Sequence, residues 1–172
     1  VELPSYRGDI INELDFNAGA RIPKPDKMLQ AYMQSAATLN LLRAFSTGGF
    51  ADMHRVHSWT LGFAEGDGAS RYGDLSARIQ DSIDFMAAAG ITGKTTHEFS
   101  SVEFYTSHEA LLLEYEEALT RLDSTSGNWL AGSGHMVWIG DRTRQPDGAH
   151  VEFASGVLNP IGLKCGPSME TD

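Results

Sequence analysis

Two short apolar runs in the last quarter of the chain constrain its fold more than any other feature. Residues 136–139 read Met-Val-Trp-Ile and are followed by Gly-Asp-Arg, and residues 161–163 read Ile-Gly-Leu and are followed by Lys164. Buried strands of a parallel sheet are apolar, and their carboxyl ends carry the functional groups. The pattern therefore predicts parallel strands at 136–139 and 161–165, with cations where they end.

A third strand is predicted at 102–105, because Val-Glu-Phe-Tyr is rich in β-forming residues. Residues 106–109 (Thr-Ser-His-Glu) match a capping box that would begin a helix. A loop over 123–134 and a helical connection over 141–159 lead to the later strands. Strands that alternate with helical connections form right-handed parallel βαβ units, so we predict an α/β fold. The apolar residues expected on one face of the first connecting helix are Leu112, Tyr115, Leu119 and Leu122.

The first 25 residues predict an irregular connecting arm, because they contain three prolines and no sustained hydrophobic period. From Asp26 the apolar residues recur at three- and four-residue steps, which is typical of an amphipathic helix. This helix is expected to stop at Gly48-Gly49. Its apolar positions are Leu29, Tyr32, Met33, Ala36, Leu39, Leu42 and Phe45.

Two further helices are predicted before residue 90. Asp52 is the expected N-cap of the first, which should end at 66–68. Ser70 is the expected cap of the second, and Gly90 lies just past its end. We therefore expect a helical insertion over 26–90 and βα units over 91–172, all within one domain.

Composition excludes several classes of function. A net charge of −10 opposes binding to a phosphate backbone, so no nucleic-acid partner is expected. No apolar run is long enough to span a bilayer, so no membrane association is expected. The single cysteine, Cys165, excludes an internal disulfide framework and fits a reducing cytoplasm. It alternates with Lys164, which predicts a buried, inert thiol on the opposite face of the strand.

Three other motifs favour structural over functional interpretations. Residues 88–95 end in Gly-Lys-Thr, as a P-loop does, but they lack its first glycine and follow a helix, so a helix end and a surface turn are predicted. His54 and His57 have no acidic or cysteine partner at metal-ligand spacing. His108 and Glu109 follow a predicted strand, but the capping box accounts for Glu109 without a functional role.

The cations that follow the two apolar strands predict an anion site, because the carboxyl ends of neighbouring parallel strands lie on the same rim. Arg142 would hold a phosphate or carboxylate through bidentate hydrogen bonds, and Lys164 would act as a point charge. Asp141 would reduce the repulsion between the cations in the empty site. The spacing leaves open a second interpretation, in which Asp141, Arg142 and Arg144 form a solvated, partly salt-bridged loop.

Longer motifs in one order carry a resemblance to a known family. They are residues 3–9 (LPSYRGD), 107–111 (SHEAL), 138–145 (WIGDRTRQ), 147–150 (DGAH) and 159–164 (NPIGLK). Over its whole length the chain resembles the class II 3-deoxy-D-arabino-heptulosonate 7-phosphate (DAHP) synthases. The resemblance implies a cytoplasmic transferase with a (β/α)8 TIM barrel. Such an enzyme condenses phosphoenolpyruvate with erythrose 4-phosphate in the first step of the shikimate pathway to aromatic amino acids.

The resemblance also implies roles for four residues. Arg142 matches the family arginine that binds the phosphate of phosphoenolpyruvate, and Lys164 matches the lysine beside the same substrate. Both would be catalytic, because they hold positive charge where oxyanions bind and phosphate departs. Asp141 stands where many members have glutamate and would help to shape the pocket, and Trp138 would lie beneath it.

A divalent metal, manganese or cobalt, is implied for the complete enzyme, but the family's metal-binding motifs do not occur in this chain. Cys165 does not replace the missing cysteine ligand. The three predicted strands would be the third, fourth and fifth of the eight in such a barrel. We therefore expect the central portion of a longer enzyme, inactive by itself, whose open sheet edges and apolar helices favour a homo-oligomer. The alternative is a non-catalytic anion-binding module derived from such an enzyme.

Overall fold

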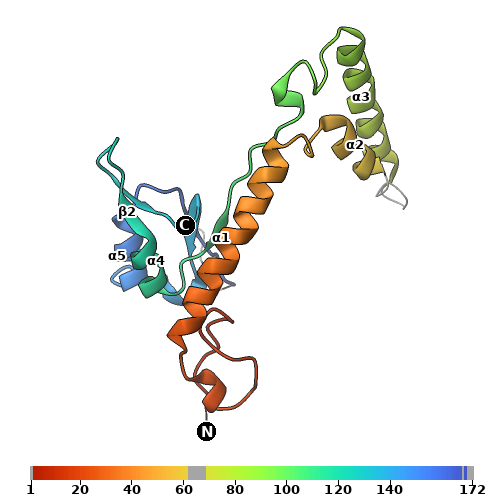
Figure 1. Cartoon of the computed structure of the whole chain (residues 1–172). Coiled ribbons are helices and arrows are strands. Elements are labelled where there is room, and N and C mark those ends of the chain that lie inside the picture. The colour runs from red at the N-terminus through yellow and green to blue at the C-terminus, as the bar shows by residue number, and fades with distance from the viewer. Residues whose placement is uncertain (1, 62–68, 168, 170–172) are drawn as a thin grey trace. The chain divides into compact units, whose positions relative to one another are not determined.

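The computed structural model describes residues 2–61, 69–167 and 169 (Figure 1). The chain divides into two compact units, which we describe separately. Unit 1 comprises residues 1–31 and 105–172, and unit 2 comprises residues 32–104. None of the described helices is long and apolar enough to cross a membrane.

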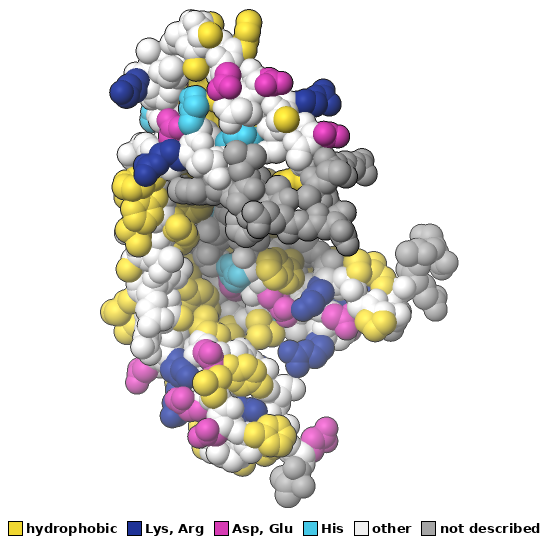
Figure 2. Space-filling model, turned by 90° about the vertical axis from the view of Figure 1, so that its right-hand side faces the viewer, with side chains coloured by type: hydrophobic (Ala, Val, Ile, Leu, Met, Phe, Trp, Pro, Cys, Tyr) yellow, Lys and Arg dark blue, Asp and Glu magenta, His cyan; other side chains and the backbone are white. Residues whose placement is uncertain are grey.

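Helix α1 (Pro25–Thr47) confirms the bounds predicted for the first helix but not the burial of its apolar face. It ends before Gly48, and Gly49 adopts a φ of +84°, which glycine allows without strain. Large apolar side chains on this helix are exposed, and Figure 2 shows hydrophobic side chains at the surface. The exposed residues of the predicted inner face are Leu29, Tyr32, Met33, Leu42 and Phe45.

Helix α2 (Met53–Leu61) has the predicted cap. Oδ1 of Asp52 accepts the backbone N–H of His54 at 3.0 Å, which satisfies a donor that the first turn leaves free. His57 is buried, and its Nε2 has no hydrogen-bond partner among the described residues. The predicted end of this helix at 66–68 lies outside the described residues.

Helix α3 (Ala69–Ala88) confirms the third predicted helix, although it begins one residue before the predicted cap, Ser70. Gly90 follows its end with a φ of +82°, as expected for a glycine that terminates a helix. Beyond it, the hydroxyl of Thr95 donates to the carbonyl of Gly90 at 2.8 Å. Residues 88–95 therefore form the predicted helix end and turn.

The arm over residues 2–24 is mostly irregular, as predicted, with one short 3-10 helix, η1 (Gly19–Arg21). Asn12 organises it from a buried position. Its Oδ1 accepts the backbone N–H of Arg7 at 2.8 Å, and its Nδ2 donates to the carbonyl of Arg21 at 3.1 Å.

A parallel three-stranded sheet confirms the predicted α/β class. It consists of β1 (Ser107–Glu109), β4 (Met136–Ile139) and β5 (Ile161–Leu163), in the order β1-β4-β5. His108 pairs with Val137, which pairs in turn with Ile161. Strand β4 has the predicted bounds, and β5 is two residues shorter than predicted. The described residues contain part of a parallel sheet but not a complete barrel.

The strand predicted at 102–105 is wrong, because the strand lies at Ser107–Glu109 instead. Val102 donates its backbone N–H to the carbonyl of Ser46 at 2.9 Å, and Val102 and Phe104 line an apolar hollow with helix α1. These two side chains therefore lie beside the end of α1 in unit 2, where Val102 is 54% exposed. β-propensity measures how well a side chain fits its surroundings, and here the surroundings are helical.

The predicted capping box at 106–109 is also wrong, because these residues extend into β1. Helix α4 (Leu113–Leu119) starts later, without a side-chain cap. The predicted face continues only partly, because Leu122 lies in β2 (Thr120–Leu122), which pairs antiparallel with β3 (Trp129–Ala131). The loop predicted at 123–134 therefore contains the turn and second strand of a hairpin.

Asp123 and Gly127 build the hairpin turn. The Asp123 carboxylate accepts backbone N–H groups from Thr125 at 3.2 Å and Ser126 at 2.9 Å, and Gly127 has a φ of +71°. The pKa of Asp123 is lowered, first by the Ser126 hydroxyl and then by these two backbone donors.

The core of unit 1 lies between the sheet and helix α5 (Ala149–Ser155), which contacts β4. Ala110, Ala131 and Val137 form its centre, and Phe153 and Val157 pack against them. The exposed fraction of Val137 is 1%. This side chain therefore stabilises both sheet and helix.

Replacing Val137 with alanine is expected to lower the free energy of unfolding by about 2 kcal/mol, because two buried methyl groups are lost and a cavity remains. Urea denaturation of the complete protein measures the change. Leu158→Ala is the control, since that side chain is 61% exposed, and its effect should be within about 0.5 kcal/mol. A Val137→Ala effect no larger than the control's would contradict the core described above.

Candidate anion site

The structure brings the carboxyl ends of β1, β4 and β5 to one rim of the sheet. Ile139 pairs with Leu163, and the backbone N–H of Lys164 donates to the carbonyl of Ile139 at 2.9 Å. The residues that follow β4 therefore start beside Lys164. A short 3-10 helix, η3 (Asp141–Thr143), carries the charged residues directly after β4.

Side-chain alternation assigns residues to the two faces of this sheet. Glu109 pairs with Trp138, which pairs with Gly162, so these three lie on one face, with Lys164 two residues further on. A Cβ atom at Gly162 would lie 2.9 Å from Cβ of Trp138, too close for a side chain. The half-buried Trp138 therefore occupies the same face as the charged rim.

Arg142, predicted to bind the anion, lies in η3 and is exposed. Its carbonyl accepts the side-chain N–H of Gln145 at 3.0 Å, while its guanidinium has no hydrogen-bond or ion-pair partner among the described residues. All its donors are therefore available to a ligand. A guanidinium in this state suits planar, bidentate binding of phosphate or carboxylate.

Lys164 is exposed, and its Nζ lies 3.7 Å from Oε2 of Glu109. Glu109 is the residue that sequence reasoning missed, because the misplaced strand assigned it to a helix cap. The signal was its position in the SHEAL motif, where it is the last polar residue before the apolar run at 110–113. Gly140 is buried against it, and a Cβ atom there would overlap the Glu109 carboxylate.

Asp141 pairs with Arg144 rather than with Arg142. Oδ1 of Asp141 is buried and lies 3.1 Å from Nε of Arg144, at an angle that does not form a hydrogen bond. A Cβ atom at Gly166 would overlap the same carboxylate. The predicted salt-bridged loop is therefore present for Asp141 and Arg144, and it leaves Arg142 outside the pair.

The rim is cationic within an acidic chain. Arg142, Arg144 and Lys164 oppose Glu109 and Asp141, so three positive charges against two negative charges leave one positive charge. Since the whole chain has a net charge of −10, this excess is local. Such a local excess of positive charge suits a small anion better than a polyanion.

Cys165 is exposed, so the prediction of a buried thiol is wrong. Strand β5 ends at Leu163, whose side chain is exposed at the edge of the described sheet. Cys165 follows two residues later, on the same side of the chain as Leu163, so its thiol lies beyond the packed side chains of the sheet. Among the described residues, no group of three or more His, Cys, Asp or Glu side chains lies close enough together to hold a metal ion.

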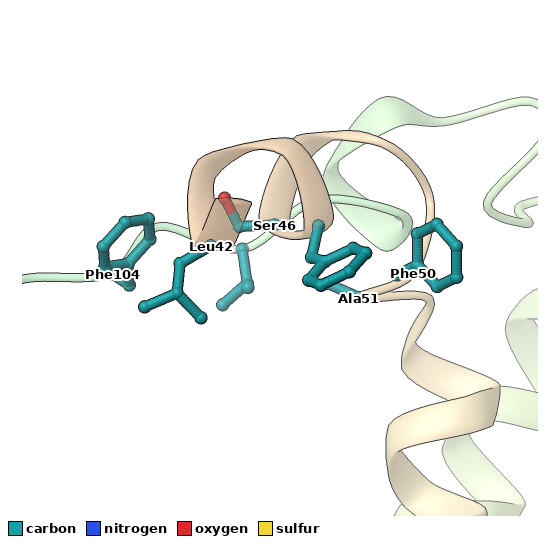
Figure 3. Close-up of a pocket in the computed structure, with 7 residues that line it drawn as sticks. Leu42, Ser46, Phe50, Ala51 and Phe104 are labelled. Atoms are coloured by element: carbon teal, nitrogen blue, oxygen red, sulfur yellow. The ribbon is translucent and has the colours of Figure 1, made fainter. Parts of the chain in front are cut away.

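Unit 2 contains a separate apolar hollow of about 580 Å³ at the end of helix α1 (Figure 3). No charged side chain lines it, so it suits only an apolar group. The sequence did not predict it, because two of its seven lining residues, Val102 and Phe104, come from a segment assigned to the sheet. Its lining residues are Leu42, Phe45, Ser46, Phe50, Ala51, Val102 and Phe104.

Comparisons with known proteins give one consistent result. A family model described as the class-II DAHP synthetase family matches residues 1–172. The chain is 53% identical over 169 residues to phospho-2-dehydro-3-deoxyheptonate aldolase of Streptomyces coelicolor, covering 98% of this chain and 37% of that protein. It is 41% identical over 172 residues to phospho-2-dehydro-3-deoxyheptonate aldolase AroG of Mycolicibacterium smegmatis, covering 96% and 36% respectively. The chain thus spans little more than a third of the length of these curated relatives.

Proposed function

This chain belongs to the class-II DAHP synthetase family, and from that membership we propose that the complete protein condenses phosphoenolpyruvate with erythrose 4-phosphate. The products are DAHP and inorganic phosphate. The observation that carries the proposal is the free Arg142 guanidinium on the same rim as Lys164, in a family that acts on anions of this kind. We also propose that the three parallel strands belong to a (β/α)8 barrel, with residues 26–90 as an insertion before its third strand.

In the proposed reaction, C3 of phosphoenolpyruvate forms a bond to the aldehyde carbon of erythrose 4-phosphate, and the aldehyde oxygen takes up a proton. A water molecule adds to C2 and releases a proton. The C2–O bond to the phosphate then breaks as the new hydroxyl becomes the C2 carbonyl of DAHP, and the hydroxyl proton leaves with the phosphate. The phosphate on C2 carries negative charge throughout, both in the substrate and as it leaves. Fixed cations stabilise such charge without reorganising during the reaction.

Arg142 is proposed to bind the phosphate of phosphoenolpyruvate through two parallel N–H donors. Lys164 is proposed to supply a point charge beside the same group, and its contact with Glu109 positions the ammonium there. Asp141 keeps Arg144 occupied, which leaves Arg142 to define the phosphate position, and Trp138 forms part of the floor of the pocket. Holding two anionic substrates together supplies the remaining large contribution to rate.

A divalent metal, manganese or cobalt, is part of the proposal for the complete protein, where it would polarise a carbonyl group. The described residues of this chain do not fit such an ion, because they bring no cluster of ligands together. The roles proposed for Arg142, Lys164, Asp141 and Trp138 concern the substrate anion alone. We further propose a cytoplasmic homo-oligomer.

Steady-state assays of the complete protein test the function. We expect phosphoenolpyruvate to be consumed only when erythrose 4-phosphate and a divalent metal are both supplied, with one phosphate released for each phosphoenolpyruvate. Consumption without erythrose 4-phosphate, or no turnover under these conditions, would overturn the proposal. Calorimetry on the same preparation separates the second candidate, a non-catalytic anion-binding module, which would bind phosphoenolpyruvate without condensing it.

A further inference from the structure

Glu116 of helix α4 is a buried acid that the proposed reaction does not use. Its exposed fraction is 2%, and both of its carboxylate oxygens have partners. Nε2 of His108 lies 2.6 Å from Oε1, and the Ser133 hydroxyl donates to Oε2. Burying a carboxylate is costly unless it is paired and hydrogen-bonded, so these two partners hold Glu116 in one position.

The partners come from different parts of unit 1. His108 lies in β1, Ser133 lies in the loop between β3 and β4, and Glu116 lies in α4. A Cβ atom at Gly134 would lie only 3.2 Å from Nδ1 of His108, so the loop also closes on the imidazole ring. We call His108, Glu116 and Ser133 the Glu116 triad, in which Glu116 is buried and the other two side chains are partly exposed. It joins a helix and a loop to the middle residue of β1.

The Glu116 triad lies directly behind the charged rim. His108 pairs with Val137 of the core, whereas the next residue, Glu109, points to the opposite face and approaches Lys164. β1 is only three residues long and pairs with a single neighbour among the described strands, so its ladder bonds alone define its position weakly. An anchor at residue 108 therefore limits how far the carboxylate at residue 109 can move.

We propose that His108 and Glu116 are positioning residues, which hold β1 so that Glu109 keeps the Lys164 ammonium in place for phosphoenolpyruvate. This inference rests on the proposed function. The triad touches no substrate and acts only through Glu109. A substitution in the triad should therefore weaken the binding of phosphoenolpyruvate and leave the binding of erythrose 4-phosphate unchanged.

A double-mutant cycle in the complete protein tests this route. Glu116→Ala is expected to raise KM for phosphoenolpyruvate about tenfold and to leave KM for erythrose 4-phosphate within about twofold of wild type. In a Glu109→Gln background, Glu116→Ala should raise KM for phosphoenolpyruvate by less than about a further twofold. The reason is that Glu116 acts on Lys164 only through the Glu109 carboxylate, which this background lacks. Glu116→Gln should restore near-normal values, since an amide can donate to His108 and accept from Ser133.

The matched control is Thr120→Val. The Thr120 hydroxyl donates to the Glu116 backbone carbonyl at 2.8 Å, so this change removes a hydrogen bond from the same helix without altering the triad. It should lower the melting temperature and leave both KM values unchanged. If Glu116→Ala does not fold, Ser133→Ala removes one bond of the triad and completes the same cycle with a smaller expected effect.

Three results would overturn the inference while the enzyme remains active: equal rises in both KM values, effects of Glu116→Ala and Glu109→Gln that multiply, or a Thr120→Val effect on the phosphoenolpyruvate KM as large as that of Glu116→Ala. Absence of condensation in the wild-type protein would instead refute the proposed function, and the positioning role with it. The two failures are therefore distinguishable.

Discussion

Replacing Arg142 with alanine is expected to lower kcat/KM for condensation by about a thousandfold in the complete protein, the largest effect of any single change considered for this chain. Arg142 is the one rim cation whose side chain has no protein partner among the described residues, so the protein does not offset its loss. Removing the guanidinium should weaken substrate binding in the ground state and reduce the stabilisation of the departing phosphate.

Arg142→Lys makes this prediction specific. Lysine keeps the charge but not the planar fork, so it should recover no more than about a tenth of the lost activity if the phosphate is held by two parallel N–H donors. Arg121→Ala is the control, because Arg121 is an exposed arginine of β2 whose guanidinium contacts only backbone carbonyls. Activity of Arg142→Ala within about tenfold of wild type would contradict the role of Arg142.

Lys164→Ala is expected to have the second largest effect, with a loss of about a hundredfold in kcat/KM and weaker phosphoenolpyruvate binding measured by calorimetry. Two causes act together. The positive charge is lost, and the Glu109 carboxylate, 3.7 Å from Nζ in the wild-type protein, is left facing the substrate anion.

A companion variant separates the two causes. In Lys164→Ala with Glu109→Gln, the repulsive carboxylate is also removed, so part of the lost affinity should return. Lys94→Ala is the control, because Lys94 is an exposed lysine of the turn after α3. Unchanged phosphoenolpyruvate affinity in Lys164→Ala would contradict the placement of the substrate at this rim.

The features that the sequence predicted correctly are those encoded by local periodicity. Strand β4 and helix α1 match their predicted bounds because an apolar run and a helical repeat each extend over a whole element. The approach of Lys164 to the end of β4 also followed from the sequence, because parallel strands align their carboxyl ends. Family motifs then gave Arg142 and Lys164 their proposed roles.

The features that the sequence did not predict depend on contacts between distant residues. Val102 and Phe104 have strand-like composition, but their neighbours are on α1, so the strand forms further on at polar residues 107–109. Because the strand was predicted in the wrong place, Glu109 was not recognised as a residue at the end of a strand. The buried Glu116 was equally hidden, because an acid in a helix normally faces solvent and only the fold brings His108 and Ser133 to it.

Gly140 and Gly166 each leave room for a carboxylate, Glu109 at the first and Asp141 at the second. The absence of a side chain at these two glycines therefore determines where the two carboxylates lie on the rim. A methyl group at either glycine carries no charge, yet it would displace a carboxylate from its place. An uncharged substitution there would therefore alter the electric field that an incoming anion meets, while the formal charge of the protein stayed the same.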